Sequence, residues 1–350
     1  MKQSFWRNKS VVLTGHTGFK GGWLAHWLSF LGAKVHGFSL PPLKKPNFFT
    51  ETKLKDIIET STFGDIRNTN EMSDFLYQSK PEIIFHLAAQ PLVLESYKEP
   101  VETFSSNVMG TINLFECARK TPSIRAIVNI TSDKCYQNNE WVRPYTEDDK
   151  LGGKDPYSAS KACVELVSEA YRRSYFMQNN IQLATARAGN VIGGGDWSEN
   201  RLFPDALRAI DKNEPLIIRH PEAVRPWQHV LSPLEGYLLL AEELYMNQDR
   251  FSEAWNFGPD NADTKSVRWI ADYLKFKRPN FNFVFKSERD TREALILKLD
   301  NSKAANRLKW SNRWDIRNSI QMTLEWHSEW LKQKDMREVT RRQIESYVCT

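Results

Sequence analysis

Thr14-Gly15-His16-Thr17-Gly18-Phe19-Lys20-Gly21 is the stretch of sequence that decides the fold of this 350-residue chain. The apolar run 10–14 precedes it and predicts a strand, and the apolar segment 22–31 that follows predicts a helix. Glycines between a strand and a helix allow a tight turn and a close approach of the backbone to a pyrophosphate, which the helix N-terminus attracts. A merely flexible loop is the alternative, but the flanking strand and helix favour a nucleotide-binding turn.

Outward from this turn, apolar strands and helical segments alternate along the first half of the chain. The alternation predicts a parallel sheet with helices on both faces, which is the doubly wound α/β architecture of the Rossmann type. The further predicted strands are 34–39, 82–87, 126–131 and 182–187, and the predicted helices between them are 70–79, 100–119 and 156–177.

The alternation of strands and helices ends after Arg187. The sequence that follows is rich in arginine and tryptophan and contains several prolines and the run Gly193-Gly194-Gly195. We therefore expect a smaller C-terminal substrate lobe beside the nucleotide-binding domain. The predicted division is a Rossmann domain for the cofactor over 1–187 with segments near 231–260 returning to it, a substrate-binding lobe over 188–230 and 281–330, and a polar helix without assigned chemistry over 331–350.

Composition excludes several classes of function. Hydrophobic content of 41%, charged content of 26% and a formal charge of +5 are those of an ordinary soluble globular protein. No basic block interleaved with aromatics suggests nucleic acid, and no apolar run is long enough to cross a membrane or to form an export signal. The cysteines indicate reduced thiols in a cytoplasmic protein and no metal site, because Cys117, Cys135, Cys163 and Cys349 are scattered without a histidine cluster.

The second predicted strand lacks the acidic residue that usually bonds the adenosine ribose of NAD. It ends Gly37-Phe38-Ser39-Leu40-Pro41, where only the serine hydroxyl can take that role, and less strongly than a carboxylate. Lys44 and Lys45 follow, so NADP stays open as an alternative to NAD, and we expect weak cofactor binding. After the third strand, Asp65 is a candidate for the adenine amino group and Ile66 for the adenine ring, with a plain polar turn as an equal alternative.

Two further stretches offer acid–base chemistry. Tyr157 and Lys161 stand four residues apart, on one face of the predicted helix. An ammonium beside a phenol favours its ionised form and makes Tyr157 a candidate base, although such pairs are also common on helix surfaces. Thr131-Ser132-Asp133-Lys134 ends a predicted strand, at the edge where open α/β sheets bind ligands. We expect Ser132 to share a substrate hydroxyl with Tyr157; the alternative is a polar turn.

These stretches, with His86-Leu87-Ala88-Ala89-Gln90 and Arg187-Ala188-Gly189-Asn190-Val191, resemble the extended short-chain dehydrogenase/reductases that act on nucleotide sugars. The resemblance runs from the first strand to at least Val230 and less clearly to about Asp300. Thr-Ser-Asp-Lys-Cys-Tyr, Gly-Gly-Gly-Asp-Trp and Arg-Pro-Trp-Gln-His-Val are similar to the 4,6-dehydratases of this family, in the branch that acts on CDP-glucose. The resemblance implies an NAD cofactor, a homodimer built through the helices 100–119 and 156–177, and a bacterial pathway of dideoxysugar and polysaccharide synthesis.

The resemblance also implies a role for each candidate in an internal redox dehydration. Tyr157, with Lys161 lowering its pKa, takes the proton of the sugar 4-hydroxyl while a hydride leaves carbon 4 and later returns to carbon 6. Asp133 protonates the departing 6-hydroxyl. Related 4,6-dehydratases carry Thr-Asp-Glu where this chain has Ser132-Asp133-Lys134, and the glutamate removes the proton on carbon 5. Lys134 takes that role only as a neutral amine, and the CDP-glucose branch also has lysine there.

The remaining expectations concern the ligands. By resemblance Asn190 contacts the diphosphate and arginines clamp it with planar forks that bond two oxygens at once, although each arginine is equally well read as a solvated surface residue. The preference for CDP-glucose as substrate rests on the resemblance alone. The candidates are, for catalysis, Ser132, Asp133, Lys134, Tyr157 and Lys161; for the cofactor, Gly15, His16, Thr17, Gly18, Phe19, Lys20, Gly21, Ser39, Asp65, Ile66, Leu87, Ala88, Ala89 and Gln90 with Tyr157 and Lys161; and for the substrate, Asn190, Arg201, Arg219, Arg225 and Arg292.

Two other functions compete with dehydration. A nucleotide-sugar 4-epimerase needs the Tyr–Lys pair and NAD but no acid–base pair for water loss, and its relatives tend to have small uncharged residues in place of Asp133 and Lys134. A non-catalytic NAD-binding protein on the same fold is the second alternative, since fold does not fix function. Such proteins often lose the tyrosine or the lysine, and this chain keeps both.

Overall fold

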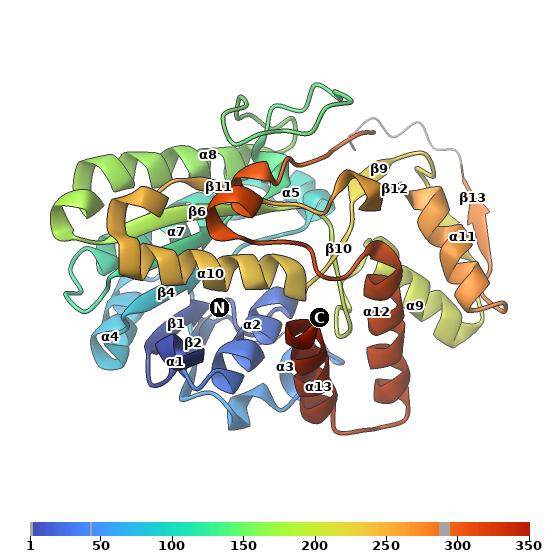
Figure 1. The fold of residues 1–350 in the computed structure, drawn as a ribbon, viewed down its shortest axis with the longest axis horizontal. Helices are drawn as coiled ribbons and strands as arrows, with labels where there is room; N and C mark the ends of the chain where they lie inside the picture. The colour runs from blue at the N-terminus through green and yellow to red at the C-terminus, as the bar shows by residue number, and fades with distance from the viewer. Residues whose placement is uncertain (1–2, 43, 287–294) are drawn as a thin grey trace.

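The computed structural model describes residues 3–42, 44–286 and 295–350, and it confirms the predicted doubly wound α/β fold (Figure 1). Within these residues the central sheet has seven parallel strands in the order β11-β6-β5-β4-β1-β2-β3, so the chain order reverses between β1 and β4. Open α/β sheets bind their ligands at such a reversal, outside the carboxyl ends of the strands. The strands are β1 (Ser10–Thr14), β2 (Lys34–Ser39), β3 (Thr60–Phe63), β4 (Ile83–His86), β5 (Ala126–Ile130), β6 (Gln182–Ala188) and β11 (Ala254–Phe257).

Two apolar cores enclose the sheet, because successive side chains of a strand point to opposite faces. Val11 and Leu13 of β1 face the core that α2 and α10 cover, whereas Val12 faces the core that α4, α7 and α8 cover. Helix α13 packs against α2. The covering helices are α2 (Phe19–Phe30), α4 (Thr69–Ser79), α7 (Gly110–Ala118), α8 (Pro156–Tyr171), α10 (Leu231–Asn247) and α13 (Met336–Cys349).

A π-helical turn interrupts the segment predicted as one helix over 100–119. The buried Asn107 lies in this turn, where its amide group donates to the Gln90 carbonyl at 3.1 Å and to Ser160 Oγ at 2.9 Å, and its oxygen accepts the Gln90 N–H at 2.8 Å. An extra residue in a helical turn re-aims such a side chain. The segment comprises α6 (Pro100–Phe104), η2 (Ser105–Met109) and α7, and a second π turn, η4 (Arg172–Phe176), follows α8.

The chain after β6 forms a smaller lobe, which lies on the right of Figure 1. Its core joins α9, α11 and α12 with the strand pairs β8–β13 and β9–β12, and Phe203, Trp227 and Ile270 are buried in it. Helix α10 and strand β11 return to the central sheet, and α11 lies outside both ranges predicted for the lobe. The elements of the lobe are β7 (Val191–Ile192), α9 (Leu202–Lys212), β8 (Leu216–Ile218), β9 (Val224–Pro226), β10 (Gln228–His229), β12 (Thr264–Ser266), α11 (Val267–Lys277), β13 (Phe283–Phe285) and α12 (Ile316–Leu331).

The polar helix predicted over 331–350 is α13, and a break near Gln333 separates it from α12. Gln333, between them, has a φ of 57°, which a continuing helix does not allow. The Asp335 side chain then caps α13 by accepting the N–H of Arg337. Helix α13 is not polar all round, since Tyr347 is buried against Trp27 of α2.

Short elements connect the main ones. Across the described ranges, no helix is long and apolar enough to cross a membrane, and no cluster of three or more His, Cys, Asp or Glu side chains could hold a metal ion. The connecting elements are α1 (Gln3–Trp6), α3 (Phe48–Glu51), η1 (Leu54–Asp56), α5 (Val93–Lys98), η3 (Asp133–Cys135), η5 (Met177–Asn179), η6 (Gln248–Phe251), η7 (Asn261–Asp263) and η8 (Ala304–Leu308).

Candidate active site

The glycine turn leaves a cradle for an anion at the start of α2. Gly15 has a φ of +78°, and a Cβ atom there would lie 2.8 Å from the backbone nitrogen of Ala88. Gly18 is the exposed N-cap residue of α2, and no side chain caps the N–H groups of the first helical turn. A Cβ on Gly18 would meet only the Gly15 carbonyl oxygen, at 3.4 Å. The open side of this turn, with uncapped N–H groups, therefore fits the pyrophosphate of a dinucleotide.

We predict that Gly21→Ala destabilises the turn and weakens cofactor binding. A Cβ on Gly21 would lie 2.1 Å from the Gly15 carbonyl oxygen, a backbone clash that the turn can relieve only by opening. Overpacking of this kind costs about 1–3 kcal/mol of unfolding free energy. Thermal unfolding and calorimetric titration with NAD+ measure the two effects. Gly18→Ser is the matched control for stability, since serine is a better N-cap residue than glycine; equal stability of the Gly21→Ala protein would contradict the prediction.

The ends of β1 and β4 are held together beside this turn. Thr14 Oγ1 accepts the N–H groups of Leu87 and Ala88, both at 3.2 Å, and lies 2.7 Å from His86 Nδ1. The predicted cofactor residues that follow β4 therefore border Gly15 across the reversal of strand order. The run continues through Ala89 to Gln90. The Gln90 side chain bonds Thr103 of α6 and the backbone of Leu92.

Hydroxyl groups occupy the end of β2, where an acidic residue is missing. Thr17 Oγ1 lies 2.8 Å from Ser39 Oγ and donates to the Leu40 carbonyl at 2.9 Å. His16 leaves only its backbone for a cofactor, because its ring is buried and bonds Ser61 Oγ at 2.8 Å. Burial lowers the pKa of His16 to about 4, so its ring is neutral.

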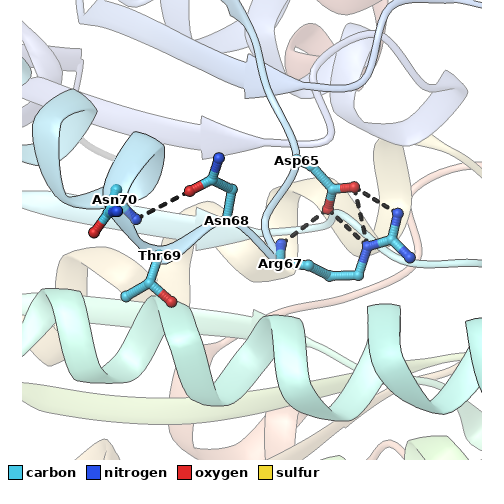
Figure 2. A pocket seen from close by; sticks show the side chains of 5 residues that line it. All are labelled: Asp65, Arg67, Asn68, Thr69 and Asn70. Atoms are coloured by element: carbon cyan, nitrogen blue, oxygen red, sulfur yellow. Dashed lines mark hydrogen bonds and ion pairs between the residues drawn. The ribbon is translucent and has the colours of Figure 1, made fainter.

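A cavity of about 680 Å³ opens beside the predicted adenine contacts, and Figure 2 shows its lining. The Asp65 carboxylate accepts the backbone N–H of Arg67 at 2.9 Å and two bonds from its guanidinium nitrogen Nε at 3.0 Å. These bonds hold the pKa of Asp65 below its usual range. A bond from adenine to this carboxylate would compete with Arg67. The neighbouring Ile66 is buried. The cavity is lined by Asp65, Arg67, Asn68, Thr69 and Asn70.

Ser132 connects the two acid–base candidates after β5. Its hydroxyl donates to Asp133 Oδ1 at 3.1 Å, accepts the Lys134 N–H at 3.2 Å, and makes a hydrogen bond with the Tyr157 phenol. Tyr157 is 8% exposed, and burial raises its pKa to about 12 although the bond with Ser132 opposes this. Burial thus dominates the pKa of Tyr157, and the predicted effect of Lys161 on it stays a prediction.

Asp133 has the environment of a general acid. Its side chain is buried, and burial raises its pKa against the opposing charges of Lys134, Lys20 and Arg225. Oδ2 has no hydrogen-bond partner among the described residues, and a Cβ on Gly189 would lie 3.1 Å from it. A carboxyl group that is protonated more readily than usual, with one free oxygen, can give its proton to a leaving hydroxyl. The half-buried Lys134 follows in η3.

Three cations surround these groups. Lys161 is buried, its Nζ lies 3.4 Å from the Ile130 carbonyl oxygen, and burial lowers its pKa to about 8. Burial and the charge of Arg201 lower the pKa of Lys20, in the first turn of α2, also to about 8. Arg201 acts on the pKa of Tyr157 as well. The structure thus places Lys20, predicted only as a cofactor contact, within electrostatic range of the acid–base group.

The predicted substrate residues separate into two sets. Arg225 is buried, donates to the carbonyls of Val224 at 2.9 Å and Leu295 at 3.2 Å, and acts on the pKa of Asp133, so it joins the site along with Arg201. Arg219 follows β8 in the smaller lobe, and its charge acts on Asp205 of α9.

Two predicted contacts are less defined. Asn190 lies between β6 and β7, and its carbonyl accepts the Gln228 N–H at 3.1 Å. Arg292 lies outside the described residues.

Sequence reasoning missed Thr14 and Gly189 as site residues. Thr14 ends one predicted strand and Gly189 comes two residues after another, and these positions were the available signal.

The fold and the site define the class of this protein: a Rossmann-type enzyme that binds a dinucleotide and pairs a buried tyrosine with an acid. Residues 11–258 match the model of the NAD dependent epimerase/dehydratase family, and the chain belongs to this family. It is 46% identical to a CDP-glucose 4,6-dehydratase from Salmonella typhimurium, over 99% of this chain and 98% of that one. The family predicted from the motifs is confirmed.

Solved structures share the fold. The DesIV double mutant, a dTDP-glucose 4,6-dehydratase from Streptomyces venezuelae with NAD bound, superposes with a TM-score of 0.76 at 22% identity, over 93% of this chain and 99% of that chain. A UDP-glucose 4-epimerase from Thermotoga maritima with UDP-glucose gives a TM-score of 0.79 at 22% identity, over 92% and 99%. Dehydratases and epimerases thus share the architecture, and the residues of the site must separate them.

Proposed function

We propose that this chain is an NAD-dependent nucleotide-sugar 4,6-dehydratase whose substrate is CDP-glucose and whose product is CDP-4-keto-6-deoxyglucose. The observation that carries the proposal is the buried Asp133 carboxyl, which has a raised pKa and one free oxygen and shares Ser132 with Tyr157. Water loss from carbon 6 needs such an acid, and a 4-epimerase has no use for it. The relative that is 46% identical along nearly the whole chain supports both the reaction and the nucleotide.

The residues of the chain divide the proton chemistry among them. Tyr157 takes the proton of the 4-hydroxyl. Ser132, which bonds the Tyr157 phenol, shares that hydroxyl with it. Lys161, one helical turn after Tyr157, contributes a positive charge that opposes the effect of burial as the phenolate forms. Once carbon 4 is a ketone, the proton on carbon 5 is acidic and Lys134 removes it. Asp133 protonates the 6-hydroxyl, which leaves as water, and carbon 5 regains a proton when the hydride returns to carbon 6.

The cofactor's residues are those of the glycine turn and the ends of β2 and β4. Gly15, Gly18 and Gly21 would hold the pyrophosphate, and Ser39 the adenosine ribose. A bound NAD+ would supply reversible hydride chemistry, for oxidation at carbon 4 of the sugar and reduction at carbon 6. Tyr157 and Lys161 extend the site from the turn to the sugar.

Mass spectrometry of the products tests the proposal. The purified protein is incubated with NAD+ and, separately, with CDP-, dTDP-, UDP- and GDP-glucose. Loss of one water from CDP-glucose alone is expected. Loss of water from another nucleotide sugar would correct the nucleotide, and unchanged mass with inverted configuration at carbon 4 would assign an epimerase instead. No turnover of any sugar would overturn the catalytic assignment.

The cellular setting of this activity follows from chemistry. The cysteines of the chain are all free thiols, which supports a reducing compartment such as the cytoplasm. A 4-keto-6-deoxy sugar still attached to its nucleotide is a substrate for reactions at the ketone. We therefore place the enzyme early in a route to deoxysugars, such as the dideoxysugars of bacterial polysaccharides.

We also propose a homodimer built through α6–η2 and α8, which pack side by side. These elements carry the exposed apolar side chains of Val101, Met109 and Leu166, which are 80%, 50% and 62% exposed. We predict that Leu166→Glu shifts the protein from dimer to monomer in analytical ultracentrifugation, because the charge would be buried in the interface. Val142→Glu is the control, because Val142 is an apolar residue that is 75% exposed in the loop after η3. A wild-type monomer would refute the proposal.

A further inference from the structure

A buried ion pair lies beneath the acid–base group and has no part in the mechanism above. Glu165 of α8 and Arg187 of β6 have side chains only 3% and 4% exposed, and Arg187 Nη2 donates to Glu165 Oε2 at 2.8 Å. Arg187 and the hydrogen bonds to the carboxylate keep the pKa of Glu165 below its usual range despite burial. The pair is therefore charged. Buried pairs are costly to desolvate and are weak evidence for stability, so a specific role is worth seeking.

The pair holds both ends of the segment that carries Ser132, Asp133 and Lys134. Before the segment, Thr131 Oγ1 donates to Glu165 Oε1 at 2.5 Å. After it, Arg187 Nη1 donates to the Tyr136 hydroxyl at 2.8 Å, and the guanidinium carbon lies 4.9 Å from the centre of the Tyr136 ring.

Further bonds fix the pair itself. Thr185 Oγ1 donates to Glu165 Oε2 at 2.7 Å, and Arg187 Nη1 donates to the Glu147 carbonyl at 3.1 Å. The Tyr136 hydroxyl donates onward to Asn256 Oδ1 at 2.7 Å. Glu165 also stands one helical turn after Lys161, on the same face of α8. One ion pair thus connects β6 and α8 with the residue that follows β5 and with the loop that follows η3.

We propose that Glu165 and Arg187 are positioning residues for the dehydration: they clamp the segment 132–134 at both ends, and Glu165 supplies the negative charge that keeps Lys161 an ammonium. This inference rests on the proposed function. Neither residue touches the substrate, and both act through the side chains they hold.

The charges around Lys161 determine in which direction its pKa moves when Glu165 is removed. Burial lowers the pKa of Lys161 to about 8, and Glu165 and Cys135 oppose it. His86, at the end of β4, and Lys20 also face Lys161; burial keeps His86 neutral, with a pKa of about 3. Glu165 is therefore the fixed negative charge among these groups. Without it the pKa of Lys161 falls further, and the ammonium loses its proton at a lower pH.

Three variants separate the clamp from the charge. Glu165→Gln is expected to lower kcat by up to about a hundredfold, as small displacements of reacting groups do, and to move the alkaline limb of the pH–kcat profile to lower pH. Arg187→Lys keeps the charge on both partners but loses the fork that reaches Tyr136, so kcat falls and the alkaline limb stays in place. The double variant Glu165→Leu/Arg187→Met removes both charges together and guards against misfolding caused by one unpaired charge. It is expected to remain slow, with the limb still displaced.

A double variant with wild-type kcat and pH profile would overturn the proposal, because it would leave the pair only a structural role. The ionisation of Lys161 can also be followed without turnover, by NMR of protein labelled with ¹³C at lysine Cε and assigned with Lys161→Arg. A lower titration midpoint in Glu165→Gln is expected, and an unchanged midpoint would contradict the electrostatic part. This measurement stands even if the wild-type protein turns over no nucleotide sugar, so the two proposals fail separately.

Discussion

Asp133→Asn is expected to stop water loss while leaving the first oxidation of the sugar possible. The amide is isosteric with the buried carboxyl and can still accept the bond from Ser132, so the site should keep its shape. It cannot, however, give a proton to the departing 6-hydroxyl, and removal of a general acid typically costs ~10²–10⁴ in rate. The measurement is a single turnover with CDP-glucose, in which the absorbance of reduced cofactor appears and persists while the dehydrated product is missing.

Asp148→Asn is the matched control, because Asp148 is an exposed carboxylate in the loop that follows the same strand. Its kcat should equal that of the wild type. Formation of dehydrated product by Asp133→Asn at the parental rate would show that another group is the acid. The half-buried neighbour Lys134 would then be the first residue to examine.

Tyr157→Phe should abolish the reaction one step earlier. The phenylalanine ring fills the same buried space, and only the hydroxyl that bonds Ser132 is lost. Without it no base takes the 4-hydroxyl proton, so neither reduced cofactor nor product should form, again with a loss of ~10²–10⁴ in rate. Stopped-flow absorbance and product analysis on the same sample distinguish this block from that of Asp133→Asn.

Tyr77→Phe, which removes a hydroxyl from a residue 77% exposed on α4, controls for the substitution itself. Cofactor reduction at the normal rate in Tyr157→Phe would be incompatible with Tyr157 as the base. Tight binding of CDP-glucose by the inactive variant is expected, because the predicted diphosphate contacts lie elsewhere, at Arg201 and Arg225.

The fold could be predicted from the sequence wherever burial alone decides the structure. Strands β1 and β2 begin and end at the predicted residues. The apolar residues of β1 are buried on both faces of the sheet, and Gly15 follows the strand directly. The π turn at Asn107 could not be predicted, because bonds to Gln90 and Ser160 decide it. The break near Gln333 depends likewise on how α13 packs against α2.

The motifs were sufficient to predict which side chains meet in the acid–base group. The stretch Ser132–Lys134, Tyr157 and Lys161 meet after β5, as the strand-end rule implies. The electrostatics were not predictable, because burial raises the pKa of Tyr157 more than a neighbouring cation lowers it. The ion pair of Glu165 with Arg187 could not be predicted either. The sequence shows that Glu165 stands one helical turn after Lys161, but its partner Arg187 lies on strand β6.

The serine at the end of β2 has a consequence for the timing of this activity in a cell. Ser39, bonded to Thr17, offers a ribose a neutral hydroxyl where related sites offer a carboxylate, and neutral hydrogen bonds are the weaker kind. We therefore expect a dinucleotide held in this way to exchange with the surrounding pool between turnovers. The overall dehydration consumes no oxidant, yet each round must begin from the oxidised form. The balance of oxidised to reduced dinucleotide would therefore set how many copies of the enzyme are ready to begin a turnover.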